Sequence, residues 1–572
     1  MVTMNRTRMT NIHLFFRAGC RQTLMPTIDR RRVIAMGLGV AALGAAPAHA
    51  RDHRPAGEPR ARERPRPIES PHEGAPQPDA SRPRVAAGPP RARVNPVAFW
   101  SNAALALNAL DHSIEAANAR APGPCAATLA MALAFTAMAD AAAVVYPAHF
   151  EGYLVRGPRI EGAEYPEAFI GGACAQVLEH IYSTPAHSQL LGMQRLAFLR
   201  LLDGGGLDAW KAGLAFGRRP EYIGRWNWRH ITYAATGSSH LYRPKFGIHD
   251  VDPFNPDQKF YGVTWGALPP LVPELTLAGV GPGPPPTERD REFRYDAEEV
   301  RDIGLYRPSG PTREQAHVGL YWAYDGARLI GTPNRLYIQI VRDIVERDGY
   351  SMPEMARALA LCAIAMADGA IVCWQAKYVY KVWRPVQAMP HLFRETRGWR
   401  PLGSPRTNPT QFALGGETRI RLTAISMMGG GYRTAAIFSR EHELSYRDAC
   451  FTPNFPSYPS GHATFGAACF RILRLTRRER EQSHQDPGRL DRGLAFVSDE
   501  MNGLSIDNFH NEVRPLTPVP FRTLEEMIES NNRSRVYLGV HWNFDCVRGA
   551  ESGARIADIV YQRAYRRRDH SS

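Results

Sequence analysis

The sequence predicts an all-α fold made of helical bundles, two of them resembling four-helix bundles, with long irregular connections. Apolar residues recur at the three-to-four spacing of a buried helix face from Phe99 onward. The sequence contains neither the alternating runs typical of strands nor a repeat of fixed period. Its 572 residues can bury a large core, and 44% hydrophobic with 22% charged residues is typical of a soluble globular protein.

The first 50 residues have the features of a cleaved export signal. An Asp-Arg-Arg-Arg sequence at 29–32 precedes a short apolar run from Val33 to Ala46, and Ala-His-Ala follows at 48–50. This order is typical of a twin-arginine signal cleaved after Ala50. The apolar run is short and rich in Gly and Ala, which argues against a membrane anchor. We therefore expect export by the twin-arginine route to a periplasmic or secreted location, with no stable membrane span in the mature protein.

Residues 51–96 are rich in Pro and Arg and predict an extended linker. The net charge of the whole chain is +14, but residues 1–96 carry +10 of it. The remaining residues are close to charge balance, which excludes a general nucleic-acid-binding face. The cysteines form no CxxC pair or zinc-type cluster, so we expect single buried thiols.

An N-terminal helical region is expected over residues 97–335. Pro124 opens an Ala-rich apolar run from Cys125 to Tyr146, long enough to cross a membrane, but it contains Asp140 and alanine contributes little transfer energy. We therefore predict a buried bundle helix there. Residues 204–288 instead form an insertion rich in Gly, Pro and aromatic residues. So long a segment with little periodicity either lines an entrance to a site or covers a helix bundle.

Residues 336–572 are expected to form a second, catalytic helical domain. Helical periodicity returns over several segments on both sides of residue 336: 296–305, 313–330, 334–348, 353–389, 409–428, the residues after His462, and 523–531. Three motifs in this part of the chain carry the chemistry.

The first motif is Pro-Ser-Gly-His at 459–462, which predicts the start of a helix that binds an oxyanion. Pro459 interrupts the preceding structure, and Ser460 is a good N-cap for a helix from Ala463 to Leu475. Gly461 allows a ligand to approach the backbone closely. Free amides, a hydroxyl and His462 would then converge at a helix N-terminus.

The second motif is the pair Lys377 and Arg384, seven residues apart and followed by Pro385. On one continuous helix the two side chains would lie on nearly the same face. Two fixed cations in a row suit an anion with several oxygens. Asp368 would lie on another face of this helix, and we expect it to be a buried, paired acid.

The third motif contains Arg535, His541 and Asp545. His541 and Asp545 are four residues apart, so on a helix the carboxylate could accept a hydrogen bond from one imidazole nitrogen and direct the other at a ligand. Gly539 offers the break in the helix that would bring Arg535 to the same place.

In order and spacing, the three motifs resemble those of the vanadium-dependent haloperoxidases, within the superfamily of type-2 phosphatidic acid phosphatases and class A acid phosphatases. The resemblance covers mainly residues 340–572, and the leader and N-terminal helices are similar to those of exported bacterial members. It implies a vanadate cofactor bound by a set of residues with these roles: His541 as the vanadium ligand, oriented by Asp545; Lys377, Arg384, Arg535, Ser460 and Gly461 as contacts to the vanadate oxygens; and His462 as the acid–base group.

The implied reaction is oxidation of bromide by hydrogen peroxide to hypohalous acid or an equivalent species that halogenates a small organic acceptor. Vanadium would stay at +5 as a Lewis acid, and Lys377 would polarise the peroxide. Phe455 stands five residues before Ser460, where chloroperoxidases of the family have Phe, and it favours chloride as a further substrate. A homodimer is compatible with the resemblance.

Two alternatives remain at this point. The same residues would suit an exported acid phosphatase with His541 as nucleophile and His462 as general acid. Lipid phosphatases of the superfamily have several membrane spans, and the small secreted enzymes lack the N-terminal helical region, so the sequence favours the haloperoxidase. The other alternative is a non-catalytic oxyanion-binding protein, against which His462 argues, because capture alone needs no acid–base group.

Overall fold

The computed structural model divides the chain into two compact units, residues 1–86 and residues 87–572. All residues that the structure describes belong to the second unit, and the predicted signal and most of the predicted linker lie outside them. The described residues are 94–112, 119–157, 164–202, 206–227, 233–234, 246–254, 259–305, 310–325, 330–403, 410–412, 426–428, 431–433, 452–480, 486–490, 495–502, 505–507, 512–513 and 516–568.

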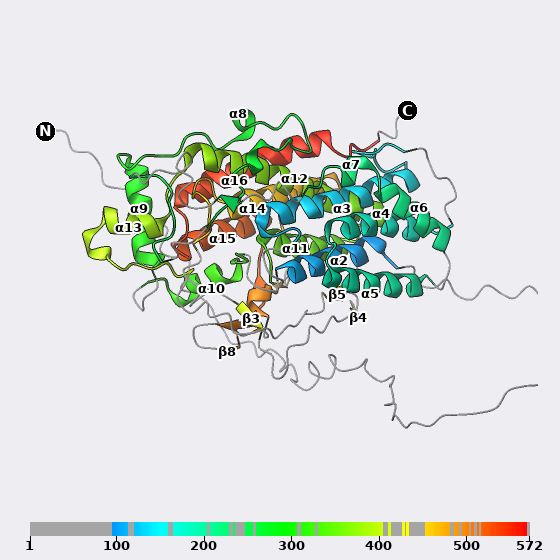
Figure 1. The fold of residues 1–572 in the computed structure, drawn as a ribbon, viewed down its shortest axis with the longest axis horizontal. Helices are drawn as coiled ribbons and strands as arrows, with labels where there is room; N and C mark the ends of the chain where they lie inside the picture. The colour runs from blue at the N-terminus through cyan, green and yellow to red at the C-terminus, as the bar shows by residue number, and fades with distance from the viewer. Residues whose placement is uncertain are drawn as a thin grey trace, which may run out of the picture. The chain divides into compact units, whose positions relative to one another are not determined.

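Helices make up most of the described residues, in agreement with the predicted all-α class (Figure 1). The α-helices are α2 (Pro96–Asp111), α3 (Gly123–Val145), α4 (Pro166–Ile181), α5 (Pro185–Leu201), α6 (Leu207–Gly217), α7 (Pro220–Ile223), α8 (Leu277–Val280), α9 (Arg291–Ile303), α10 (Arg313–Tyr321), α11 (Pro333–Arg347), α12 (Met352–Tyr380), α13 (Pro385–Leu392), α14 (Gly461–Glu479), α15 (Leu524–Tyr537) and α16 (Asn543–Arg563). Short 3-10 helices are η2 (Trp265–Ala267), η3 (Arg394–Thr396) and η4 (Asp499–Met501).

The strands are two or three residues long and pair antiparallel. They are β1 (Tyr233–Ala234), β2 (Phe260–Tyr261), β3 (Thr410–Phe412), β4 (Ser426–Met428), β5 (Gly431–Arg433), β6 (Ala495–Phe496), β7 (Ser505–Asp507), β8 (Glu512–Val513) and β9 (Val519–Pro520). The prediction of a helix over 409–428 is wrong for the described residues at its two ends, which form β3 and β4. They pair with β7 and β5, and such cross-strand partners cannot be recognised from helical periodicity.

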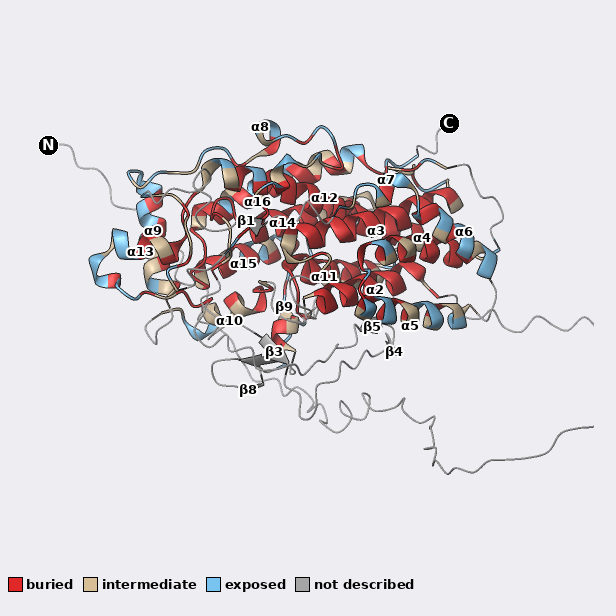
Figure 2. Cartoon of the chain, in the orientation of Figure 1, coloured by how far each residue is buried: buried red, intermediate tan, exposed pale blue. Residues whose placement is uncertain are grey.

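The helices form two groups that pack against each other. In the first group α4 packs on α3 and α6, and α2 packs on α4 and α5. In the second group α14 packs on α12, α15, α16 and α11. The two groups meet where α3 packs along α12. Figure 2 shows α3 and α12 buried along most of their length.

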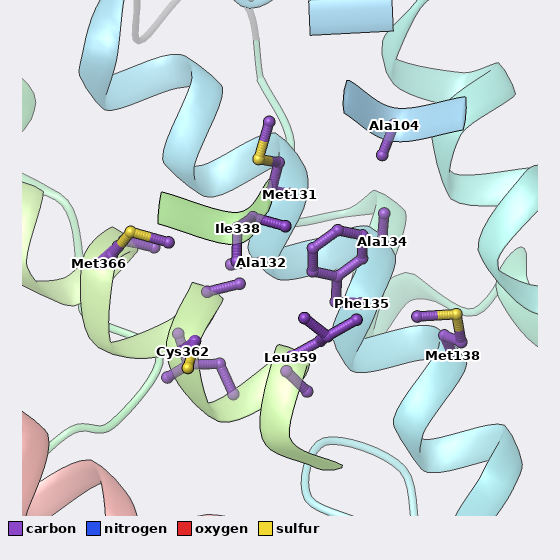
Figure 3. Close-up of a cluster of buried hydrophobic side chains, with 14 of the residues drawn as sticks. Ala104, Met131, Ala132, Ala134, Phe135, Met138, Ile338, Leu359, Cys362 and Met366 are labelled. Atoms are coloured by element: carbon purple, nitrogen blue, oxygen red, sulfur yellow. The ribbon is translucent and has the colours of Figure 1, made fainter. Parts of the chain in front are cut away.

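Small and flexible apolar side chains fill the contact between α3 and α12. Phe135 and Met138 of α3 lie close to Leu359 of α12 in Figure 3, with Ile338 of α11 beside them. Alanines of α3 allow the two helix backbones to come close, and the sulfur-containing side chains adapt to the remaining gaps. By length and composition α3 and α12 could each cross a membrane, and in this structure the most apolar part of each is almost wholly buried.

The six cysteines among the described residues are buried and unbridged, as predicted. Asp368 is also a buried, paired acid, as predicted. It accepts hydrogen bonds from the amides of Leu271 at 2.6 Å and Val272 at 2.9 Å. Since both amides belong to the insertion at 204–288, Asp368 fixes that insertion to α12.

Candidate active site

The Pro-Ser-Gly-His motif opens α14, as predicted. Ser460 is the N-cap, and its hydroxyl accepts a hydrogen bond from the amide of Ala463 at 3.4 Å. The Ser460 amide donates to the carbonyl oxygen of Asp545 at 2.9 Å. This bond joins the start of α14 to the start of α16, so the first and third motifs lie side by side.

Lys377 lies in the last turn of α12 with a fully buried side chain. Its Nζ donates to the carbonyl oxygens of Pro456, Ser457 and Pro459 at 2.5–2.9 Å. Burial lowers the pKa of Lys377 to about 8. In this structure the amine therefore holds the segment that leads into the motif, and its contact with bound peroxide stays a prediction.

Arg384 reaches the site from a different element than predicted. The prediction of one continuous helix carrying Lys377 and Arg384 is wrong, because α12 ends at Tyr380 and Lys381 turns into the left-handed region with φ +53°. Arg384 is instead the N-cap of α13, and Pro385 opens that helix because proline suits the first helical position. The side chain of Arg384 is still buried in the site, where Nη1 donates to the carbonyl oxygen of Val540 at 2.7 Å.

His541 is held by a carboxylate, as predicted, although it does not itself lie on a helix. Helix α15 ends at Tyr537, Gly539 has φ +71°, and His541 comes just before α16. Asp545, in the first turn of α16, lies with Oδ2 2.8 Å from His541 Nδ1. Burial raises the pKa of Asp545 to about 7. Above that pH the ionised carboxylate can only accept, so Nδ1 carries the proton and Nε2 carries the lone pair. That lone pair faces Arg384, whose Nη1 is 3.2 Å away.

Ser457 is a part of the site that sequence reasoning missed. Its hydroxyl donates to Asp545 Oδ2, and the amide of Trp542 donates to the same oxygen at 3.2 Å. Together with His541, three donors therefore fix this carboxylate. Ser457 lies two residues before the Pro-Ser-Gly-His motif, but an isolated serine gives no signal of a buried partner 88 residues away.

Arg535 and His462 share a second acidic partner. Arg535 Nη2 donates to Asp325 Oδ1 at 2.7 Å, and His462 Nε2 lies 3.7 Å from the same oxygen. His462 Nε2 also lies 2.7 Å from the carbonyl oxygen of Ala323, which requires the proton on Nε2 and leaves the lone pair on Nδ1. Sequence reasoning missed Asp325 and Ala323, although Asp-Gly at 325–326 is a turn signal four residues after the end of α10.

Phe455 packs beside the cations. Its ring centroid lies 5.1 Å from Lys377 Nζ and 5.1 Å from Arg384 Cζ, within cation–π range. The ring of Trp374, also missed by sequence reasoning, lies 4.7 Å from that of Phe455. The predicted halide-site residue therefore forms one wall of the site.

The balance of charge shows what the site can hold. The side chains of Lys377, Arg384 and Arg535 are each fully buried. Among the described residues, Asp325 and Asp545 are the acids that act on Arg384, and burial raises the pKa of both carboxyl groups. Two guanidinium nitrogens, Arg384 Nη2 and Arg535 Nε, are buried without a hydrogen-bond partner in the described part of the chain. Unpaired buried donors of this kind are costly, so the geometry suits a bound anion that accepts from them.

Both histidines are neutral in this environment. Burial first, and then the charge of Arg535, holds the pKa of His462 well below its usual range. Burial and then Arg384 hold the pKa of His541 well below its usual range. A neutral imidazole with a free lone pair is the form that can ligate a metal or accept a proton.

Comparison with known proteins agrees with this geometry. Residues 357–570 match a family model described as VCPO second helical-bundle domain. The chain is also similar to the vanadium chloroperoxidase of Curvularia inaequalis, with 27% identity over 540 residues that cover 80% of each chain. Together these matches support assignment of the chain to the vanadium haloperoxidases, with residues 357–570 as the matching domain.

Two solved structures share the fold of this chain. A bacterial vanadium-dependent iodoperoxidase aligns with a TM-score of 0.56 and 16% identity, covering 82% of this chain and 96% of that protein. The holo form of a bacterial vanadium-dependent chloroperoxidase aligns with a TM-score of 0.51 and 14% identity, covering 80% of this chain and 95% of that protein.

The residues present fit vanadate, the cofactor of this family. Arg384 Nη2 and Arg535 Nε have no protein partner among the described residues and are free to donate to oxyanion oxygens. His541 offers Nε2 as a metal ligand because Asp545 fixes the proton on Nδ1. Ser460 and Gly461 stand at the N-terminus of α14, where anions bind favourably. The predicted ligand set is thus gathered around one group of buried cations.

Proposed function

We propose that this protein is a vanadate-dependent haloperoxidase that oxidises halide with hydrogen peroxide to hypohalous acid or an equivalent halogenating species. One observation carries the proposal: three buried cations, two of them with unpaired donor atoms, surround a histidine whose Nε2 lone pair is exposed to them. Such a site binds an oxyanion of a metal that accepts a nitrogen ligand.

Each residue has a separate task in this reaction. Bound vanadate supplies a Lewis acid that activates hydrogen peroxide for a two-electron oxidation without a change in the oxidation state of the metal. Arg384 and Arg535 neutralise the anion, and His541 anchors it through Nε2. His462, neutral and protonated on Nε2, takes a proton from hydrogen peroxide at Nδ1.

We further propose bromide and chloride as the halides and a small organic molecule as acceptor. The support is Phe455, which presents an aromatic wall to the two cations Lys377 and Arg384 instead of a titratable group. An apolar wall lowers the hydration of a halide that lies near the cations. Chloride is the more strongly hydrated of the two ions, so its reactivity depends more than that of bromide on this loss of hydration.

The test is a pair of assays on one preparation of residues 51–572. With orthovanadate, bromide and hydrogen peroxide, we expect halogenation of an electron-rich phenol, and stripping vanadate should abolish it. Equal rates with and without vanadate would refute the proposal. Release of phosphate from an aryl phosphate without peroxide, inhibited by vanadate, would support the acid phosphatase instead.

We also propose that the protein is exported folded by the twin-arginine route, becomes periplasmic or secreted without a membrane span, and forms a homodimer. The support for export is the basic residues at 30–32, the short apolar run after them and the Ala-x-Ala sequence at 48–50. Sequencing of the exported protein should give Arg51 as its first residue, and replacement of Arg30 and Arg31 by lysine should retain it in the cytoplasm. Light scattering of the purified protein measures the dimer.

A further inference from the structure

We infer that Asn531 is a positioning residue for His462, because the Asn531 side chain fixes the backbone of this acid–base histidine. Tyr337 orients the Asn531 side chain, and Gly466 leaves room for that side chain. This inference rests on the proposed function, because it assigns a task in that reaction. Neither the sequence motifs nor the vanadate contacts include these three residues.

The contacts come from three different helices. Asn531 of α15 donates from Nδ2 to the carbonyl oxygen of His462 at 2.9 Å. The hydroxyl of Tyr337, on α11, lies 2.9 Å from Asn531 Oδ1 and 3.2 Å from the same carbonyl oxygen. Tyr337 and Asn531 are fully buried, so no solvent competes for these bonds.

The hydrogen bonds have one consistent direction. A tyrosine hydroxyl has a single proton, and the shorter contact assigns it to Asn531 Oδ1. Asn531 must then present Nδ2 to His462, because the reversed amide would set two oxygens against each other. The chain therefore runs from Tyr337 through Asn531 to the carbonyl oxygen of His462, and each donor polarises the next.

Gly466 provides the space for this arrangement. A Cβ atom at Gly466 would lie 2.6 Å from Asn531 Nδ2 and 3.6 Å from Cζ of Tyr337. The first of these distances is too short for any real contact, so alanine at 466 would push Asn531 away. Gly466 stands four residues after His462, and in an α-helix its amide already satisfies one lone pair of the His462 carbonyl.

His462 is thereby anchored at both ends. Its ring is held at Nε2 by the carbonyl oxygen of Ala323, and its backbone is held by Asn531. A helix carbonyl needs no second donor, so the buried amide is not explained by hydrogen-bond satisfaction alone. Fixing both ends restricts the direction in which Nδ1 points, and proton transfer depends on that direction.

The experiment combines three substitutions with a matched control. Asn531→Leu removes the donor at nearly constant volume, Gly466→Ala displaces it, and Tyr337→Phe removes only the orienting hydroxyl. The control is Tyr321→Phe, which deletes another buried hydroxyl, bonded to the Phe496 carbonyl oxygen at 3.2 Å. The holoenzyme is assayed for bromide oxidation, and vanadate affinity is measured separately by calorimetry.

We expect kcat to fall about tenfold in Asn531→Leu and Gly466→Ala, and about threefold in Tyr337→Phe, with vanadate Kd within about twofold of wild type. Tyr321→Phe should change neither quantity. In a His462→Ala background, Asn531→Leu should have no further effect on the residual turnover, because it acts through the histidine. Nitrogen NMR of histidine-labelled protein, which needs no turnover, should show one Nε2–H tautomer for His462 in the wild type and exchange between tautomers in Asn531→Leu.

Several outcomes would overturn the inference. One is an unchanged kcat in all three variants, and another is a loss of vanadate affinity that matches the loss of kcat. A third is that Asn531→Leu lowers turnover by the same factor in the His462→Ala background as in the wild type. The fourth is an unaltered His462 tautomer in Asn531→Leu. Absence of wild-type halide oxidation refutes the proposed function instead, and the NMR measurement still decides whether Asn531 positions His462.

Discussion

Replacing Asp545 by asparagine tests whether this carboxylate prepares His541 to bind vanadate. The substitution is expected to change both the vanadate affinity and the free energy of unfolding, and the two are measured separately. Asp545 Oδ2 accepts from His541 Nδ1 at 2.8 Å, from the amide of Trp542 at 3.2 Å and from Ser457. A hydrogen bond to an ionised acceptor is worth about 1 kcal/mol more than one to a neutral amide. Above the raised pKa of Asp545, about 7, where the carboxylate is ionised, the three bonds together therefore lose about 3 kcal/mol in Asp545→Asn.

Part of that loss appears in cofactor binding. Only the bond to Nδ1 holds the histidine in the tautomer that offers Nε2 to the metal, so we expect vanadate Kd to rise about 10- to 100-fold. This range corresponds to about 1.4–2.8 kcal/mol, which is within the total estimated from the three bonds. Calorimetric titration of the metal-free protein with orthovanadate measures it.

The matched control is Asp140→Asn in α3. Asp140 is equally buried and also accepts three hydrogen bonds, from the amides of Tyr153 and Val155 and from the hydroxyl of Tyr222, at 2.6–3.0 Å. It touches none of the vanadate-site residues, so we expect vanadate Kd to remain unchanged. Equal losses of vanadate affinity in both variants, or no loss in Asp545→Asn, would refute the argument that Asp545 acts through His541.

Three further predictions address the site and the fold. His541→Ala should abolish vanadate binding, whereas His462→Ala should bind vanadate but lose about 10²- to 10⁴-fold in kcat, and calorimetry with steady-state assays distinguishes the two. Phe455→His should lower the chloride-to-bromide ratio of kcat/KM, because an imidazole replaces the aromatic wall beside two cations; an unchanged ratio would remove Phe455 from halide selection. Burial raises the pKa of Asp368 to about 7, above its unfolded value, so wild-type stability should fall as pH rises from about 4 to 7. In urea titrations at several pH values, the unfolding free energy of Asp368→Asn should fall less steeply with pH than that of the wild type, because Asp140 and Asp296, whose pKa values burial also raises to about 6, keep their share of the slope. Parallel pH profiles would contradict the assignment.

The sequence by itself determined the helical class and the motifs from which the site is predicted. Helical periodicity located α2, α3, α9, α11, α12, α14 and α15, because apolar spacing is a local property of each segment. The fixed order of three motifs predicts roles for His462, Arg535 and His541, and these roles stay predictions. Ser460 caps α14 as predicted, because its hydroxyl needs only the next turn. The pairing of His541 with Asp545 was also found, since four residues are a short span.

Only the tertiary structure decided which distant groups complete the site. Lys377 is bound by carbonyls 79 to 82 residues away, and Asp325 meets Arg535 across 210 residues. No pattern of local residue spacing predicts such partners, because their proximity depends on how α10, α12 and α15 pack against each other. For the same reason the break between α12 and α13 was not foreseen: Lys381 takes a left-handed conformation that lets Arg384 turn back into the site. The sequence thus specified the chemistry of the ligands, and long-range packing specified the carbonyls, carboxylates and amide that hold them in place.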